Sequence, residues 1–284
     1  MTTHKHTLPR EVSPGVFWIG DCLVQRTRGK VYHGYNAAYV VAGETASCLL
    51  DTGAPKDFLV IDNHINQLLA KGIPPLKYLM LSHAETPHAG GLARVMAKYP
   101  DVILCGDVSD YHLAFPQFAH RLLSLEVGDE IDLGGRKLLM CEPVIRDLRS
   151  SLWAFDTLGH VLFPADGFAY SHYHLDGHCG LLAEEAISLD LKDVSAVFSE
   201  RALFWTKFVD MNVYINELRA LIKKLDVRFI CPTHGLPISD VARTVPKVEE
   251  GLLFAGQEEM SPQGDLAQAA LTGSMKEPGL VAGE

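Results

Sequence analysis

A stretch of six residues, His83 to His88, combines side-chain types that bind metal ions. It reads His-Ala-Glu-Thr-Pro-His and so holds two imidazoles and a carboxylate. The apolar run Tyr78–Leu81 comes directly before it, and a helical pattern follows it. Imidazoles and carboxylates gathered at the end of a buried strand are typical of a metal site. The sequence therefore predicts a metal centre whose first ligands are His83, Glu85 and His88.

Three further ligand-type residues lie at the ends of other apolar runs. Asp166 and His234 each come just after such a run, and Asp147 comes shortly before one. Strand ends in a fold of two sheets meet at a common edge, so these side chains can share one site. The expected ligands are His83, Glu85, His88, Asp147, Asp166 and His234.

The positioning elements are predicted from the periodicity of apolar residues. Strands are expected at 15–20, 36–41, 46–50, 78–81, 102–105, 130–133, 137–141, 152–155, 161–164 and 227–231, and helices at 56–70, 89–98, 180–189, 194–225 and 239–249. Hairpins interleaved with helices predict an α+β fold, namely an αββα sandwich of two mixed β-sheets with flanking helices. Phe204 and Trp205, within the longest predicted helix, are expected to pack in the core.

The chain divides by composition into three parts. Residues 1–14 form a predicted N-terminal arm, residues 15–255 a single domain, and residues 256–284 a tail rich in Gly, Ser, Gln and Glu. The tail shows no apolar periodicity, which is typical of disordered segments.

Charge and hydropathy exclude two classes of partner. The formal net charge of -10 leaves no basic stripe for nucleic-acid phosphates. No apolar run approaches the roughly 20 residues that a membrane-spanning helix needs. The six cysteines form no CxxC pair, which favours free thiols in a reduced compartment. We therefore expect a cytoplasmic protein that binds neither nucleic acid nor membrane.

The combined motif resembles the metallo-β-lactamase superfamily. The pattern His83-x-Glu85-x-Pro87-His88-x-Gly90, followed by Asp166 and by Pro232-Thr233-His234-Gly235, is similar to that superfamily's metal-binding motif. Asp51-Thr52-Gly53 also matches its Asp-Thr-Gly after the first hairpin. The resemblance covers residues 15 to 237 and implies the superfamily's metal site.

Glu85 points to one branch of this superfamily. The hydrolases have His at that position, whereas the flavodiiron proteins and the stand-alone oxygen-binding diiron proteins have Glu. The stretches Tyr35–Tyr39 and Leu162–Phe168 resemble the same branch. This resemblance implies two iron ions, with mixed iron and manganese or zinc as alternatives. The carboxylates support it, because hard anionic oxygens suit iron or manganese better than zinc.

Asp147 departs from the family pattern. It stands where the family places a third histidine, and as a ligand it would complete a first site with His83, Glu85 and Asp166. The alternative is a surface residue that forms ion pairs with Arg146 and Arg149, with Glu142 as the substitute ligand.

Pro87 is the second departure, because it replaces a family aspartate that binds the second metal. That site would keep His88, Asp166 and His234, which suffice for a metal with open positions or for a weakly held one. His172 and His178 are candidate catalytic residues that could orient a ligand or replace the lost one. The alternative is that they are surface histidines.

Two functions are compatible with these residues. The resemblance implies a diiron protein that binds or reduces dioxygen or nitric oxide, or oxidises a small substrate, with an external electron donor. The alternative is a metal-dependent hydrolase of an ester, lactone or related bond. A metal-free binding scaffold is a third option, which the number of retained ligands disfavours. A homodimer is one option for the oligomeric state.

Overall fold

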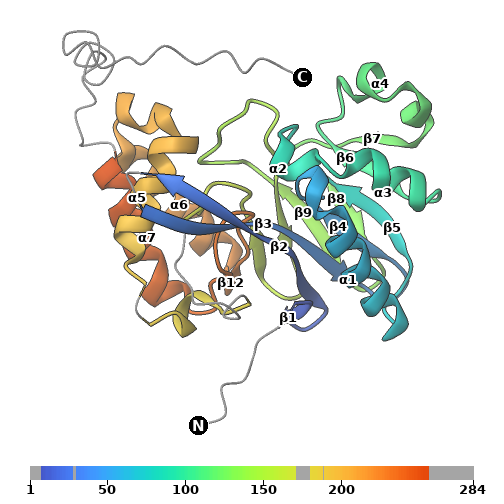
Figure 1. Ribbon diagram of the computed structural model, residues 1–284, viewed down its shortest axis with the longest axis horizontal. Coiled ribbons are helices and arrows are strands. Elements are labelled where there is room, and N and C mark those ends of the chain that lie inside the picture. The colour runs from blue at the N-terminus through green and yellow to red at the C-terminus, as the bar shows by residue number, and fades with distance from the viewer. Residues whose placement is uncertain (1–7, 28–29, 171–179, 188, 256–284) are drawn as a thin grey trace, which may run out of the picture.

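The computed structural model describes residues 8–27, 30–170, 180–187 and 189–255, which fold into two mixed β-sheets with helices around them (Figure 1). The first sheet contains β1 (Arg10–Ser13), β2 (Val16–Thr27), β3 (Lys30–Ala42), β4 (Ser47–Leu50), β5 (Leu76–Met80), β6 (Ile103–Gly106) and β7 (Leu122–Ser124). The second contains β8 (Glu130–Asp132), β9 (Lys137–Cys141), β10 (Trp153–Asp156), β11 (Val161–Phe163) and β12 (Phe229–Ile230). The predicted αββα sandwich is confirmed. β1 falls within the predicted N-terminal arm, and the predicted tail lies outside the described residues.

Both sheets place parallel strands next to one another. The first sheet is antiparallel from β1 to β4 and parallel from β4 to β7. In the second sheet β11 pairs in parallel with β12, and the other neighbouring strands of that sheet pair antiparallel. Parallel strands bring their carboxyl ends to the same edge of a sheet, so the residues that follow β4 and β5, and those that follow β11 and β12, are brought together.

The alternation of side chains along β3 divides the core in two. Tyr39 and Val41 pack between the two sheets, whereas Ala38 and Val40 face the other side, where α1 (Phe58–Ala70) and α3 (Leu92–Lys98) cover the first sheet. This period of two is what a strand imposes on its side chains. Every residue of β10 and β11 is buried, so this part of the second sheet is covered on both faces.

The remaining helices lie on two sides of the molecule. In Figure 1, α5 (Leu191–Ala202), α6 (Met211–Leu225) and α7 (Val241–Ala255) group at the left, and α4 (Tyr111–Ala114) lies at the upper right. The short helix α2 (Thr86–Ala89) lies near the centre, and the long strands β2 and β3 run across the molecule. Short 3-10 segments occur at η1 (Pro55–Asp57), η2 (Pro116–Arg121), η3 (Ala183–Glu185) and η4 (Phe204–Phe208). Across the described ranges, no helix combines the length and the apolar character that crossing a membrane requires.

Two predicted helices in the second half of the chain do not form as single helices. The described residues of the stretch 180–189 form only the turn η3, and the stretch 194–225 is divided among α5, η4 and α6. The second division has a local cause, because the Asp210 side chain accepts a hydrogen bond from the Asn212 amide and begins a new helix. Phe204 is 63% exposed, so its predicted place in the core is wrong.

Glu184 fastens the start of α7 to the turn η3. Its carboxylate accepts hydrogen bonds from the amide and hydroxyl of Ser239, from the amide of Asp240 and from the hydroxyl of Thr244. Burial alone would raise the pKa of Glu184, but these bonds outweigh it and lower the pKa below 4.5. A negative charge at a helix N-terminus is also favoured by the helix dipole.

We expect Glu184→Gln to lower the free energy of unfolding by about 1–2 kcal/mol at pH 7, because hydrogen bonds to a charged acceptor are lost. A lowered pKa means that the contribution is present above the unfolded-state pKa and is lost as pH falls through the folded-state value. Urea unfolding at several pH values should therefore show the two proteins converging below pH 4.5. The exposed Glu250→Gln on the same helix serves as the control. A difference that is constant with pH would contradict this role.

Candidate metal centre

Four strand ends bring the candidate ligands to one place. Asp51 follows β4, and His83 lies in the loop after the neighbouring parallel strand β5. In the second sheet Asp166 follows β11, and His234 follows the parallel strand β12. The residues expected at the common edge of the two sheets therefore lie next to one another. The cause is the predicted one, namely that the ends of these strands meet at that edge.

Three imidazole nitrogens converge on the carboxylate of Asp166. Its Oδ2 lies 3.4 Å from Nε2 of His83, and its Oδ1 lies 3.4 Å from Nε2 of His88 and 3.3 Å from Nε2 of His234. Asp166 is 3% exposed, and the three histidines are also buried. A carboxylate shared among three imidazoles is an arrangement that can bridge two metal ions.

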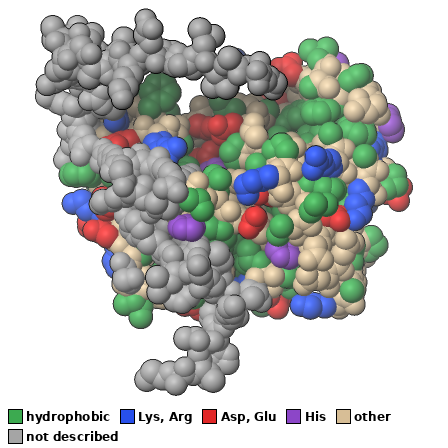
Figure 2. Space-filling model, viewed as in Figure 1, with side chains coloured by type: hydrophobic (Ala, Val, Ile, Leu, Met, Phe, Trp, Pro, Cys, Tyr) green, Lys and Arg blue, Asp and Glu red, His purple; other side chains and the backbone are tan. Residues whose placement is uncertain are grey.

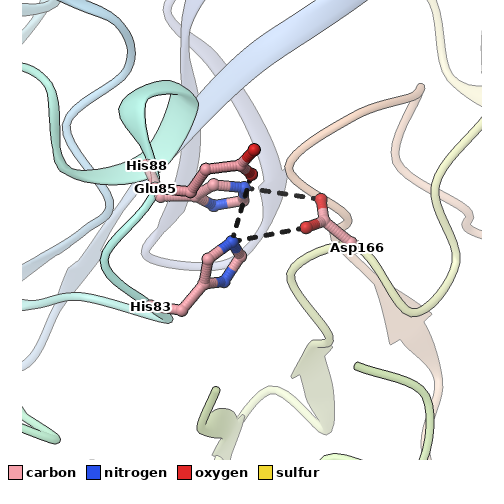
Figure 3. Close-up of side chains that lie close together, drawn as sticks. All are labelled: His83, Glu85, His88 and Asp166. Carbon is pink, nitrogen blue, oxygen red and sulfur yellow. Dashed lines mark ion pairs between the residues drawn. The ribbon is translucent and has the colours of Figure 1, made fainter. Parts of the chain in front are cut away.

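Glu85 forms the open side of this cluster. Figure 3 shows that His83 and Glu85 come from the loop before α2 and His88 from α2 itself, with the two imidazoles directed toward Asp166. Oε2 of Glu85 lies 3.6 Å from Nε2 of His83, and one ligand atom from each of the four residues in Figure 3 lies within 4.8 Å of the others. The Glu85 side chain is 51% exposed. Figure 2 shows Asp and Glu side chains gathered in a recess on this face of the molecule.

The alternative role of Glu85, as a carboxylate that caps a helix, has no support in the geometry. Glu85 occupies the N-cap position of α2, but its side chain makes no capping hydrogen bond. Interaction with His83 is the largest influence on its carboxyl group and lowers its pKa. Glu85 therefore belongs to the cluster rather than to the helix.

Asp51 fixes the orientation of His88. Its Oδ2 lies 2.8 Å from Nδ1 of His88 and accepts hydrogen bonds from the hydroxyls of Ser82 and Thr233, while its Oδ1 accepts one from the Ser82 amide. When Nδ1 of His88 donates its proton to Asp51, Nε2 is left with a lone pair directed at the centre. Asp51 has a φ of 59°, a left-handed conformation that aspartate adopts more readily than most residues.

His234 is held in the same tautomer by the backbone. Its Nδ1 donates a hydrogen bond to the carbonyl oxygen of Tyr35 on β3, which leaves Nε2 free to face Asp166. The neighbouring Thr233 joins the two sheets, because its carbonyl accepts a hydrogen bond from the amide of Ala37. Metal-binding histidines commonly donate their second nitrogen in this way.

Two glycines allow the ligand loop to approach β4 closely. A side chain at Gly90 would meet Pro55, and one at Gly91 would meet the carbonyl oxygen of Thr52 at 2.7 Å. The Gly91 amide also donates a hydrogen bond to the Thr52 hydroxyl. The predicted helix 89–98 therefore begins later than expected, since α3 starts at Leu92 after the two glycines and Ala89 is the last residue of α2.

Charge in the cluster is strongly coupled. Burial would raise the pKa of Asp166, but His88, His234 and His83 outweigh it and hold that pKa below its usual value. Burial would lower the pKa of His88, but Asp166 and Asp51 raise it well above 6.5. The pKa of Asp147 is raised by burial and by the carboxylates of Asp166 and Glu85. Several carboxylates compete for few positive charges, which a bound cation would relieve.

The donor atoms fit a metal ion. Nε2 of His83, Nε2 of His88 and Oδ1 of Asp166 are buried and have no hydrogen-bond partner. Leaving such atoms unpaired costs about 1–3 kcal/mol each, so native proteins rarely keep them in this state. Directed lone pairs on two imidazoles and a carboxylate are the donors that iron, manganese and zinc accept.

Asp147 lies beside the cluster, as the sequence register indicated. Its Oδ2 is 3.6 Å from Nε2 of His83, and its side chain is 13% exposed. The alternative ion pair with Arg146 does not form, because Arg146 instead pairs with Glu142 at 3.5 Å. Glu142, the substitute ligand, has a side chain that is 61% exposed.

Pro87 is explained by local structure. It occupies the first turn of α2, where a missing amide proton leaves no hydrogen bond unmade. The two residues considered as replacements for the lost ligand, His172 and His178, lie outside the described residues.

The sequence alone did not identify the residues that orient the candidate ligands. Asp51 was noted as a strand-end residue and family motif, but its bond to His88 depends on a contact between residues 37 positions apart.

We expect Asp51→Asn to weaken metal binding by about 10–100-fold, since an amide cannot hold the His88 tautomer as the carboxylate does. Competition against a chromophoric chelator measures this change. Asp62→Asn, which alters a carboxylate on α1 bonded to Tyr99 and Lys98, is the matched control. Unchanged metal affinity in Asp51→Asn would contradict the orienting role.

The sequence profile of the metallo-beta-lactamase superfamily matches residues 31–182. Among curated proteins, the chain is 26% identical over 241 residues to a coenzyme F420H2 oxidase of Methanothermobacter marburgensis, covering 80% of this chain and 57% of the relative. It is 24% identical over 253 residues to a nitric oxide reductase of Moorella thermoacetica, covering 80% and 57%. The chain thus spans less than two thirds of the length of these relatives.

A solved structure shares the fold. The flavodiiron protein from Giardia intestinalis superposes with a TM-score of 0.66 at 19% identity, covering 85% of this chain and 58% of that one. The predicted resemblance to flavodiiron proteins is confirmed. The predicted fold, which those proteins also contain, is confirmed as well.

Proposed function

Because this chain belongs to the metallo-beta-lactamase superfamily, we propose that it is an iron-containing oxidoreductase that reduces dioxygen or nitric oxide with electrons from an external donor. The relatives support this choice, since two of them are described as an oxidase and a nitric oxide reductase. The observation that carries the proposal is the ligand set, in which Glu85, Asp147 and Asp166 surround His83.

The proposal includes two metal positions, which the distances around Asp166 support. The first would be held by His83, Glu85, Asp147 and Asp166. The second would be held by His88, His234 and the other oxygen of Asp166. Iron bound at these positions would supply electron transfer and oxygen or nitric oxide chemistry.

The protein residues have distinct roles in this proposal. Asp51 and the Tyr35 carbonyl hold His88 and His234 in the tautomer that presents Nε2. Asp166 supplies negative charge shared between both positions, which favours the more highly charged state of a redox metal. The second position has three protein ligands because Pro87 offers none, which leaves sites open for a small molecule.

Gas uptake tests this function. Protein loaded with ferrous iron without oxygen should take up nitric oxide or dioxygen in proportion to its iron content, measured with gas-selective electrodes. Zinc-loaded protein should take up neither, because zinc is not redox active. Absence of uptake by the ferrous protein, together with ester hydrolysis by the zinc-loaded protein, would replace this function with the hydrolase.

A further inference from the structure

A surface groove of about 370 Å³ lies beside the metal centre. Its walls come from the segment before β10, which includes Asp147 and Arg149, and from η4 and α6, which contribute Trp205 and Tyr214. Small-molecule sites span about 300–1,000 Å³, so the groove is large enough for a compact organic ligand.

Asp147 connects the groove to the centre. It lines the groove, and its Oδ2 lies 3.6 Å from Nε2 of His83. Its Oδ1 accepts a hydrogen bond from the Leu148 amide, which fixes the carboxylate between the two spaces. A molecule in the groove would therefore lie next to a side chain that faces the cluster.

The aromatic wall is fixed in place. The indole nitrogen of Trp205 donates a hydrogen bond of 2.8 Å to the carbonyl of Arg146, and its ring packs against Tyr214 with centroids 5.1 Å apart. Both side chains are half-buried rather than placed in the core. A rigid aromatic surface next to the groove favours a planar ring by stacking.

The charges of the groove leave one arginine for a ligand. Arg146 pairs with Glu142 at 3.5 Å, whereas Arg149 is exposed and pairs with no carboxylate in the part of the chain that the structure describes. A guanidinium binds a carboxylate through two parallel hydrogen bonds. Glu217 also lines the groove, but it is exposed, so water screens its repulsion of an anion.

We propose that this groove binds a planar aromatic carboxylate, with its ring against Trp205 and Tyr214 and its carboxylate on Arg149. Such a ligand is held beside Asp147 at the edge of the metal centre. This site goes beyond the proposed function, which names no organic ligand, and it rests on that function only for the identity of the metal.

Isothermal titration calorimetry of the iron-loaded protein without oxygen, with benzoate as the probe, tests the site. Arg149→Gln should weaken benzoate binding about two- to fivefold, because an ion pair with an exposed guanidinium is lost. Trp205→Leu should weaken it about threefold or more, because the stacking surface is lost. Glu217→Gln should leave benzoate affinity nearly unchanged, because water screens the repulsion from this exposed carboxylate.

Controls separate this site from direct binding to the metal. Arg243→Gln, in a different groove that involves α7, should leave benzoate affinity unchanged. Cyclohexanecarboxylate, which has the same charge but no planar ring, should bind more weakly than benzoate. Benzoate that binds equally well to wild type, Arg149→Gln and Trp205→Leu would be a metal ligand, and absence of any benzoate binding would equally overturn the proposal. Thermal unfolding verifies that each variant is folded.

The titration involves no gas, so its outcome is independent of the proposed function. Benzoate bound in the groove of a protein that takes up neither dioxygen nor nitric oxide would overturn the function and leave the groove assignment intact. Gas uptake by a protein that binds no benzoate would do the reverse.

Discussion

Asp166→Asn is expected to weaken metal binding by more than about a hundredfold and to abolish gas uptake. Its carboxylate is the only group among the described residues that contacts His83, His88 and His234 together. The change removes a negative charge that both metal positions share and replaces one of the two carboxylate oxygens with an amide nitrogen. This loss is greater than that of an orienting partner outside the ligand set, which costs about 10–100-fold. Metal content after reconstitution and desalting measures the effect.

The control for this variant is Asp62→Asn, which neutralises a carboxylate away from the cluster. It should retain as much metal as the wild type. If Asp166→Asn retains as much metal as the wild type, Asp166 is not a ligand shared by the two proposed metal positions.

Glu85→His is expected to shift metal preference from iron toward zinc and to abolish uptake of dioxygen. The substitution replaces a hard anionic oxygen beside His83 with a neutral imidazole, which favours zinc and stabilises ferric iron less. Because the Glu85 side chain is half-exposed, the larger ring can be accommodated without repacking the core. Elemental analysis and oxygen-electrode measurements report the two effects separately.

Glu130→His, at an exposed position on β8 that pairs with Lys137, controls for the introduction of a histidine. Its metal content should equal that of the wild type. Oxygen uptake that survives Glu85→His would mean that Glu85 is not a ligand of the reactive metal.

The placement of the candidate ligands could be predicted because it follows from strand direction. His83 and Asp166 follow buried strands, and the apolar runs that make those strands are visible in the sequence. The parallel pairing of β4 with β5 and of β11 with β12 brings their ends together. Asp147 is close in sequence to β10, so its register could be counted from that strand. Its position beside His83 could therefore be predicted as well.

Other features could not be predicted because they depend on long-range packing. The bond between Asp51 and His88 joins residues that no local pattern relates. The division between α5 and α6 is masked by an apolar period that continues across it, although Asp210 is a recognisable N-cap. Trp205 has the large apolar side chain that is typical of a core residue, and its place in the groove wall follows from the turn η4.

The most direct test of the account is the metal content of protein purified and reconstituted with ferrous iron without oxygen. The account predicts about two iron ions per chain, bound at the two positions that share Asp166. Protein that retains zinc alone and rejects iron under these conditions, while hydrolysing ester substrates, would contradict it.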